Sequence, residues 1–463
     1  MKNKKLEEFN NSIKGKKVAI IGLGVSNEPL IDYLKSLNAD LMVFDNREQE
    51  KIDERILEKI NKNNIKISFG KNYLSKLKEF DIIFKSPSCR PDLPELEAEV
   101  KRGAILTSEV EQVLELAPCK IIAVTGSDGK TTTTSLIYEI LKNKYKCFLG
   151  GNIGTPLFTK INEMQPEDIV VLELSSFQLM TMKKSPNIAV ITNITPNHLD
   201  IHKSYEEYIE AKKNILKYQT ESDILVLNYD NSITKELKKE AKGKTIFFSS
   251  KEKLTNGIIY DEGIVKQSDN DLRRHILKYS NTLLRGEHNA ENVCAAIAAT
   301  ESLVDVEEQA KAICEFKGVN HRIEFVREID NVKWYNDSIG SSPTRTIAGL
   351  KAFNEEIVLI AGGYDKHLDY EPIAEPIIEK VKTLILMGAT AEKIFGVVRK
   401  KEEETGKNIP IYKVSSLNEA IEKAKETAKP GQVVLFSPAS ASFDMFKNFE
   451  ERGNKFKELV KNI

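Results

Sequence analysis

A short apolar run at 121–124 is followed by glycines, a lysine and a series of hydroxyl residues, a combination suited to binding phosphate. Gly126 and Gly129 would let the backbone turn tightly, and the amides that open the next helix would offer partial positive charge to an anion. Lys130 could then neutralise phosphate, and the Thr131 hydroxyl could hold magnesium. The chain lacks the earlier glycine of the general P-loop pattern. The alternative is therefore a strand-to-helix turn with a solvated lysine.

Two residues further along, Glu173 and His198, could take part in the same chemistry, and two lysines follow them. Glu173 ends an apolar run, so burial would require a partner, which could be magnesium, a lysine or a helix end. His198 follows another apolar run beside polar residues and could join a polar cluster, although a simple turn histidine is the alternative. Lys212 and Lys213 lie on a predicted helix with a charged face, and physical chemistry alone favours solvated side chains for both.

Two other segments could bind a nucleotide. Asn289 and Asn292 fall on one face of a predicted helix and could bind an adenine edge, or instead cap the helix and bond within the core. Near the N-terminus, a strand at 18–21 leads into a glycine turn, as in dinucleotide-binding folds. Asn27 stands where the third glycine of that fingerprint belongs, so nicotinamide chemistry does not follow, and a nucleotide-free turn is the alternative.

Length and composition favour a small-molecule enzyme with several domains. At 463 residues the chain can form about three domains. The 68 basic and 69 acidic residues nearly balance, which favours neither a nucleic-acid partner nor a membrane surface. Five scattered cysteines predict neither a disulfide framework nor a zinc site. Without a signal-peptide core or a long apolar run, we expect a cytoplasmic protein with no membrane insertion.

Apolar runs alternate with amphipathic, Lys/Glu-rich segments from one end of the chain to the other, which predicts an α/β fold. We expect a Rossmann-like domain at 1–108, a central P-loop-type domain with a mostly parallel sheet at 109–317, and a second Rossmann-like domain at 318–463. The predicted strands of the last region, at 333–335, 357–360, 384–387 and 433–436, end in small or polar residues. Such ends meet at one edge of a parallel sheet and indicate a further binding site.

With these motifs in order, the chain resembles the Mur ligase family over nearly its whole length. The segments that carry the resemblance are 126–132, 150–154, 172–178, 197–200 and 286–289, and the run 437–453 resembles the members that add D-glutamate. The resemblance implies a monomeric, ATP- and Mg²⁺-dependent ligase of the cytoplasmic stage of peptidoglycan synthesis. ATP would phosphorylate the carboxylate of UDP-N-acetylmuramoyl-L-alanine, and the amine of D-glutamate would attack the resulting acyl phosphate. The central domain would bind the ATP, and the first domain the UDP group.

The resemblance also implies roles for individual residues. Lys130, Glu173, His198 and Lys212 would be catalytic. Lys212 would carry a carbamate, which requires an unprotonated amine and so predicts a depressed pKa. The metal would be held by Thr131, Glu173, His198 and carbamylated Lys212. ATP would contact Gly126, Ser127, Asp128, Gly129, Lys130, Thr131, Thr132, Asn289, Asn292, Arg322 and Asp337.

Substrate contacts follow from the same resemblance. Those implied are Val25, Ser26, Asn46, Arg47 and Ser86 for UDP, Asn152 for the muramoyl group, and Lys366, Ser442 and Phe449 for D-glutamate. The chain departs from the family at Ile339, where many relatives have a lysine, and Ser341 could keep a polar contact there. Asp128 replaces a common asparagine and would repel phosphate unless its side chain turns away.

Three other functions compete with this hypothesis. A sister ligase, such as a folylpolyglutamate synthase or another Mur enzyme, is disfavoured by the predicted UDP-binding domain and the C-terminal run. A non-catalytic nucleotide sensor is suggested by Ile339 and Asp128. A dinucleotide-dependent oxidoreductase is disfavoured by Asn27.

Overall fold

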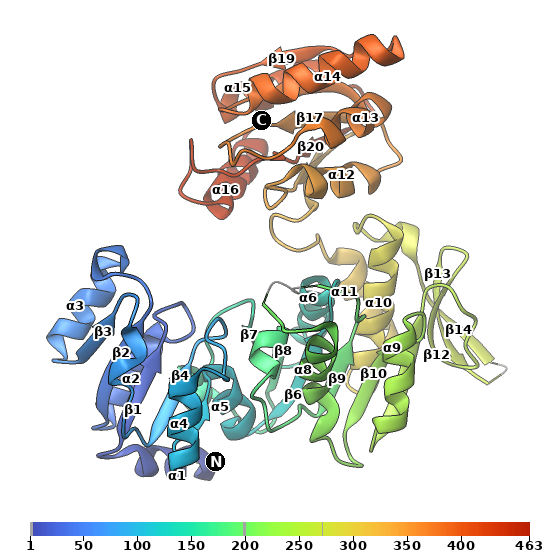
Figure 1. Ribbon diagram of the computed structural model, residues 1–463. Coiled ribbons are helices and arrows are strands. Elements are labelled where there is room, and N and C mark those ends of the chain that lie inside the picture. Colours follow the sequence, from blue (N-terminus) through green and yellow to red (C-terminus); the bar gives the residue numbers. More distant parts are fainter. Residues whose placement is uncertain (1–2, 198–200, 271) are drawn as a thin grey trace. The chain divides into compact units, whose positions relative to one another are not determined.

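The computed structural model describes residues 3–197, 201–270 and 272–463. The chain divides into two compact units, one formed by residues 1–279 with 290–313 and the other by 280–289 with 314–463. The described strands form three mixed or parallel sheets of five, nine and six strands, with helices packed on their faces (Figure 1). The α/β class predicted from the sequence is confirmed.

The first sheet is parallel, in the order β3-β2-β1-β4-β5. Its region contains α1 (Lys4–Ile13), β1 (Lys17–Ile21), α2 (Glu28–Ser36), β2 (Asp40–Asp45), α3 (Glu54–Lys62), β3 (Lys66–Phe69), β4 (Ile82–Lys85), α4 (Pro94–Arg102) and β5 (Ile105–Thr107). All four residues of β4 are buried, as expected when helices cover both faces of a parallel sheet.

The central sheet has the order β14-β13-β12-β11-β10-β9-β6-β8-β7. Its first part contains α5 (Glu109–Leu116), β6 (Lys120–Thr125), α6 (Lys130–Leu141), β7 (Cys147–Gly151), β8 (Ile169–Glu173), α7 (Ser176–Leu179), β9 (Ile188–Ile191), α8 (Tyr205–Lys217), β10 (Ile224–Asn228) and α9 (Ser232–Glu236). The second part contains β11 (Lys244–Ser249), β12 (Asn256–Asp261), β13 (Ile264–Asp269), β14 (Leu272–Lys278), α10 (Glu287–Thr300) and α11 (Val306–Glu315).

An antiparallel extension of this sheet was not expected from the sequence. The strands from β7 to β12 are parallel, but β12, β13 and β14 pair antiparallel. Five of the seven residues of β14 are exposed, and the strand carries two arginines and a histidine. Because it has no continuous apolar run, the sequence pattern does not reveal it as a strand.

The first two sheets share a core, which joins the N-terminal and central regions within one unit. Phe158 is buried at 1% exposure, and its ring makes edge contacts with Phe9, Tyr33 and Phe84. The carboxylate of Glu109 accepts hydrogen bonds from the backbone amides of Leu157 and Phe158. Aromatic packing and a buried carboxylate with two donors therefore hold the first sheet against the second.

The third sheet has the order β15-β16-β20-β17-β18-β19, parallel except for the β15–β16 hairpin. Its elements are β15 (Glu324–Ile329), β16 (Val332–Asn336), α12 (Pro343–Lys351), β17 (Ile357–Ala361), α13 (Glu371–Lys380), β18 (Val381–Leu386), α14 (Ala391–Thr405), β19 (Ile411–Lys413), α15 (Leu417–Thr427), β20 (Val433–Phe436) and α16 (Phe449–Lys461). The predicted strands at 333–335, 357–360 and 433–436 are confirmed, and the one predicted at 384–387 overlaps β18, which begins three residues earlier.

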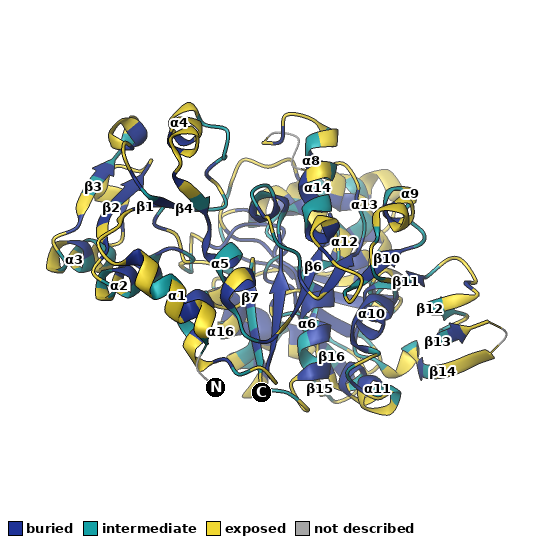
Figure 2. Ribbon diagram, turned by 90° about the horizontal axis from the view of Figure 1, so that it is seen from below, coloured by how far each residue is buried: buried dark blue, intermediate teal, exposed yellow. Residues whose placement is uncertain are grey.

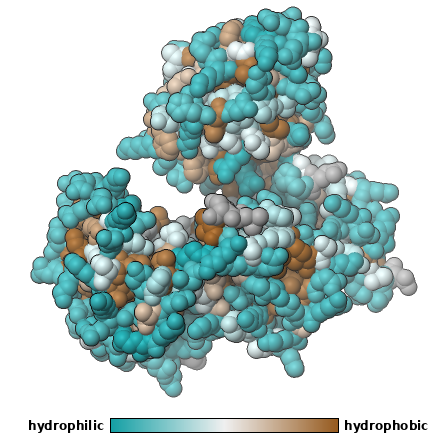
Figure 3. Space-filling model, in the orientation of Figure 1, coloured by the Kyte–Doolittle hydropathy of each residue, from teal (hydrophilic) through white to brown (hydrophobic). Residues whose placement is uncertain are grey.

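Buried residues collect in the strands and on the helix sides that face them, while the outer helix faces are exposed (Figure 2). The face seen in Figure 3 is mostly hydrophilic, with small separate apolar patches. Among the described residues, no helix is long and apolar enough to cross a membrane.

Leu172 tests how much the central core depends on β8. Its side chain is fully buried, whereas Leu272 is 77% exposed. Leu172→Ala should lower the free energy of unfolding by about 2–5 kcal/mol, because it removes buried apolar atoms and leaves a cavity. Leu272→Ala is the matched control and should change it by less than about 0.5 kcal/mol. Urea unfolding followed by circular dichroism measures both, and equal effects would contradict the assigned core.

Candidate active site

The phosphate loop connects β6 to α6 through two glycines with positive φ. Gly126 has φ 155° and Gly129, the N-cap of α6, has φ 78°. A Cβ atom at Gly126 would collide with the Thr192 hydroxyl, and one at Gly129 would collide with the Asn292 side chain. Both positions therefore require glycine for backbone conformation and for space. The predicted strand, loop and helix are confirmed.

Two lysines converge on this loop. The Lys130 Nζ donates to the carbonyls of Gly126 and Ser127, each at 2.9 Å. The Lys212 Nζ, from α8, donates to the same Gly126 carbonyl at 2.7 Å and to the Thr125 hydroxyl at 3.3 Å. The geometry places two amines beside the backbone where an anion would be bound.

Lys212 is buried, not solvated. It is 1% exposed, and its Nζ lies 4.7 Å from the centre of the Tyr208 ring. Burial lowers the pKa of Lys212 well below its usual value, and the positive charge of Lys130 lowers this pKa further. Solvation, which the charge pattern favoured for both helix lysines, is wrong for Lys212; Lys213 instead forms ion pairs with Glu210 and Glu240. The predicted direction of the Lys212 pKa is confirmed.

Glu173 faces the loop from the end of β8. One carboxylate oxygen accepts a hydrogen bond from Asn152 at 2.7 Å, and the other, Oε2, is buried with no hydrogen-bond partner in the described chain. A buried carboxylate oxygen without a donor suits a bound cation, so the residues present fit magnesium. Thr131 is partly exposed at the start of α6, while the predicted ligand His198 lies outside the described residues.

Several loop contacts were missed by sequence reasoning. The Asn193 side chain accepts from the Asp128 amide, and Ser127 bonds the Tyr208 hydroxyl at 2.8 Å. Asp128 itself is exposed. Tyr208 lies one helical turn before Lys212 and therefore on the same face of α8. This spacing could have indicated from the sequence that Tyr208 lies near the loop.

Of the two asparagines on α10, Asn292 has a packing role that the sequence left open. It is 5% exposed, accepts from the Thr133 hydroxyl at 3.2 Å and lies against Gly129. Asn289 donates to the Arg285 carbonyl at 2.7 Å. The adenine contact predicted for both remains a prediction.

In the first sheet, Asp45 organises the glycine turn. Its carboxylate accepts from the Leu23 amide and forms a bidentate pair with Arg47. The buried Asn27 side chain donates to the carbonyls of Ile21 and Gly22, which explains why this turn does not use a third glycine. Of the predicted UDP residues, Val25, Asn46 and Arg47 are exposed, and Ser26 and Ser86 are partly buried.

In the second unit, Asp337 follows β16 and is 4% exposed. It accepts from the Ser437 hydroxyl at 2.7 Å and from the Ile323 amide at 3.2 Å. Burial raises the pKa of Asp337 to about 7. The predicted phosphate contact Arg322 is exposed, and Arg345 donates to the carbonyl of Ile339, the residue that replaces the family lysine.

The predicted D-glutamate residues lie on loops of the same unit. Lys366 is exposed, with its Nζ 5.4 Å from the Phe443 ring centre, while Ser442 is buried and Phe449 begins α16. Ser341 is partly buried. A residue not predicted, Arg452, is fully buried and donates to Ser338, Ser440 and Ala441. Arg452 therefore ties the loop of Ser442 to the segment after Asp337.

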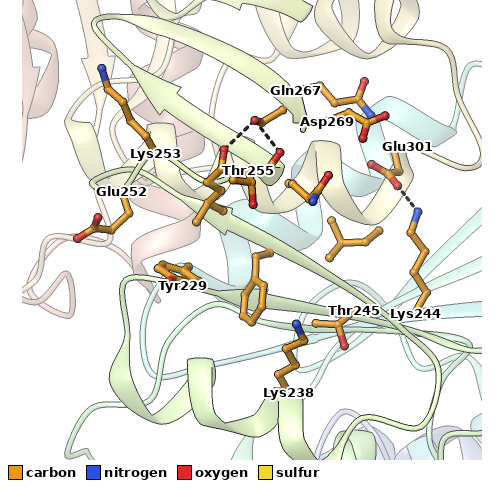
Figure 4. Close-up of a pocket in the computed structure, with 16 residues that line it drawn as sticks. Tyr229, Lys238, Lys244, Thr245, Glu252, Lys253, Thr255, Gln267, Asp269 and Glu301 are labelled. Atoms are coloured by element: carbon orange, nitrogen blue, oxygen red, sulfur yellow. Dashed lines mark hydrogen bonds and ion pairs between the residues drawn. The ribbon is translucent and has the colours of Figure 1, made fainter. Parts of the chain in front are cut away.

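A cavity of about 680 Å³ lies elsewhere, on the β11–β13 side of the central sheet (Figure 4). Lys244 and Glu301 pair at its edge, and Tyr229 and Phe247 form part of its wall. None of the predicted site residues lines it. This cavity is therefore separate from the candidate site at the glycine loop.

Comparisons with known proteins agree along the whole chain. Family models match as "Mur ligase MurD-like, N-terminal domain" at residues 16–108, "Mur ligase middle domain" at 124–300 and "Mur ligase, glutamate ligase domain" at 321–440. A UDP-N-acetylmuramoylalanine--D-glutamate ligase of Acetivibrio thermocellus is 54% identical, over 100% of this chain and 99% of its own length. The chain belongs to the Mur ligase family. A ligase of the same name from Clostridium novyi is 50% identical, covering 99% and 100% of the two chains.

Solved structures of other Mur ligases share the fold. UDP-N-acetylmuramate-alanine ligase MurC from Thermotoga maritima aligns with a TM-score of 0.57 at 23% identity, covering 96% of this chain and 99% of its own. MurF ligase from the same organism, in complex with ADP, gives a TM-score of 0.53 at 20% identity over 98% and 97%. At these identities the likeness concerns the fold, and it agrees with a three-domain Mur ligase.

Asp337 should make the stability of this Mur ligase depend on pH. Its pKa in the folded protein, about 7, lies above that of an unfolded aspartate, so the folded state binds more protons between these values. Relative to Asp337→Asn, the wild-type free energy of unfolding should fall by about 2 kcal/mol as pH rises from about 5 to about 7, then level off. Urea unfolding of both proteins across this range measures the difference, and parallel pH profiles would contradict it.

Proposed function

We propose that this Mur ligase joins D-glutamate to UDP-N-acetylmuramoyl-L-alanine in an ATP-dependent reaction. The observation that carries the proposal is identity of about half the residues, over the full length, to ligases named for this reaction. The phosphate loop with two converging amines supports it, because phosphorylation of a carboxylate requires neutralisation of phosphate charge. A sister ligase, a nucleotide sensor or an oxidoreductase would not account for this full-length identity to D-glutamate ligases.

The residues of the loop have separate tasks in this proposal. The amides after Gly126 and the Lys130 amine bind the phosphates of ATP, while Thr131 and Glu173 hold magnesium together with His198. Magnesium, when bound, neutralises charge on the transferred phosphoryl group. Asn152 orients Glu173 through its 2.7 Å hydrogen bond and lies within reach of the muramoyl substrate. Asn289, Asn292, Arg322 and Asp337 complete the ATP site.

Lys212 becomes a carbamate in this proposal. A neutral amine attacks carbon dioxide, a C–N bond forms and one proton leaves, so that a cation becomes an anion able to bind metal. The support is the burial of Lys212, which favours the neutral amine needed for this step.

The flanking domains select the substrates. The first domain, proposed as residues 1–108, binds UDP through the glycine turn with Val25, Ser26, Asn46, Arg47 and Ser86. The last, 318–463, binds D-glutamate through Lys366, Ser442 and Phe449, with Ser341 nearby. A lysine and a hydroxyl suit a carboxylate, and D-glutamate has two. The proposed site of action is the cytoplasm, where ATP and UDP-linked precursors are available.

Substrate dependence tests the reaction. With UDP-N-acetylmuramoyl-L-alanine and MgATP, phosphate release should require D-glutamate, because phosphate leaves only when the amine attacks the acyl phosphate. L-lysine or diaminopimelate in its place should give less than about 1% of the rate. L-lysine has only one carboxylate, and the two carboxylates of diaminopimelate are separated by a longer chain that carries a second ammonium group. Phosphate release is followed continuously, and the peptide product by mass spectrometry. The proposal would be excluded if L-lysine or diaminopimelate stimulated phosphate release as strongly as D-glutamate does.

The carbamate has its own test. Lys212→Ala should lower kcat by at least about 100-fold, because it removes the carbamate that would help to hold magnesium against the transferred phosphoryl group. Added formate or acetate should restore part of the activity by supplying a carboxylate. Lys213→Ala, on the same helix, is the matched control. It removes the surface ion pairs with Glu210 and Glu240 and should retain near-normal turnover. Unchanged kcat in Lys212→Ala would remove the carbamate from the mechanism.

A further inference from the structure

Arg90 forms a junction between the first domain and the segment that opens α8. Its guanidinium makes a bidentate pair with Asp92, at 2.9 and 3.0 Å, and a second pair with Glu207 on α8, at 2.8 and 3.3 Å. It also donates to the Ile201 carbonyl at 2.6 Å. Arg90 is 21% exposed and each carboxylate 27%, so these pairs are partly shielded from water. Planar, bidentate geometry makes them stronger and more directional than ordinary surface pairs.

On its first-domain side, Arg90 belongs to the loop that follows β4. The Cys89 amide donates to the Ser86 carbonyl and closes a turn, and the Ser86 amide donates to the Ile21 carbonyl at the end of β1. A Cβ atom on Gly22 would lie 2.5 Å from the Ser86 hydroxyl oxygen. The loop thus rests directly on the glycine turn proposed to bind UDP. A ligand at this turn would contact the loop and restrict its conformation.

On its central-domain side, Glu207 continues the network toward the metal site. Its Oε2 accepts from the Lys203 amide at 2.7 Å and lies 3.5 Å from Nδ1 of His202. His202 is 2% exposed, its Nε2 lies 2.9 Å from the Ser176 hydroxyl, and its ring stacks on Phe177. Ser176 follows Glu173 by three residues, and Lys212 follows Glu207 by five on the same helix.

We propose that Arg90 is a positioning residue that couples UDP-substrate binding in the first domain to the geometry of Glu173 and Lys212, acting through Glu207 and His202. This rests on the proposed function, and it adds a linkage between two ligand sites that the reaction itself does not require. Because both domains bias one hydrogen-bonded network, binding at either site strengthens binding at the other by the same factor. An ion pair that only held the two domains together would add stability without linking the two ligand sites.

Calorimetry measures the linkage directly. The dissociation constant of UDP-N-acetylmuramoyl-L-alanine is determined with and without Mg²⁺ and a non-hydrolysable ATP analogue. In the wild type we expect the nucleotide to tighten substrate binding by about tenfold, within the usual range for coupled sites. The coupling ratio is the dissociation constant measured without the nucleotide divided by the one measured with it. In Arg90→Ala this ratio should fall to within about twofold of one. Glu207→Gln and the double variant should give the same ratio as Arg90→Ala, because all three break one contact.

A control variant separates coupling from general loss of stability. Lys59 is 24% exposed and pairs with Glu28 and Asp32 in the first domain, so Lys59→Ala removes a comparable ion pair away from this network. It should keep the wild-type ratio. Hydrogen exchange of the ligand-free protein gives a second measurement: the Lys203 amide, held by Glu207, should exchange about tenfold faster in Arg90→Ala and at the wild-type rate in Lys59→Ala.

The outcomes distinguish this proposal from the proposed function. Wild-type protein that binds both ligands with a ratio near one would overturn the linkage and leave the ligase assignment intact. An unchanged ratio in Arg90→Ala, or an equal loss in Lys59→Ala, would overturn the role of Arg90. Wild-type protein that binds no UDP-substrate would overturn both.

Discussion

The Gly126 carbonyl accepts hydrogen bonds from two lysines, Lys130 and Lys212, and the rest of the active site depends on this crowding of positive charge. Two ammonium groups beside one buried carbonyl repel each other, so one is driven toward its neutral form. Burial decides that this is Lys212, which forms no ion pair within the described chain. The candidate site therefore suits added negative charge, which in the proposed mechanism is phosphate at the loop and a carbamate on the neutral amine.

The same constraint explains the surrounding contacts. Glu173 is held by an amide donor, Asn152, which leaves its second oxygen available, whereas a lysine partner would have neutralised it. The Tyr208 hydroxyl bonds Ser127 and its ring faces Lys212, so one residue of α8 fixes both loop and amine. In the second unit, the buried Arg452 contacts carbonyl and hydroxyl oxygens. Uncharged polar groups, from side chains and backbone, thus order these segments without neutralising their charged residues.

Much of the fold followed from the sequence because buried parallel strands are short apolar runs bounded by glycine and polar residues. The strands β1, β17 and β20 were predicted at or within one residue of their observed bounds. The antiparallel strands β12 to β14 were not, since their stability comes from pairing with neighbours along the sheet. Among site residues, the loop glycines were recognised by local pattern. Asn193 and Arg452 were not, because their contacts join segments distant in sequence.

The sequence by itself determined the order of strand, loop and helix around Lys130, since backbone conformation at Gly126 and Gly129 is a local property. It also carried the family resemblance that the comparisons bear out. The resemblance singled out Lys212, but the charge pattern of the helix did not determine which of two adjacent lysines is buried. Only the tertiary structure decided that, because packing of α8 against β6 directs Lys212 inward and Lys213 toward Glu210 and Glu240. Desolvation, and with it the chemistry available to an amine, depends on neighbours that no local pattern specifies.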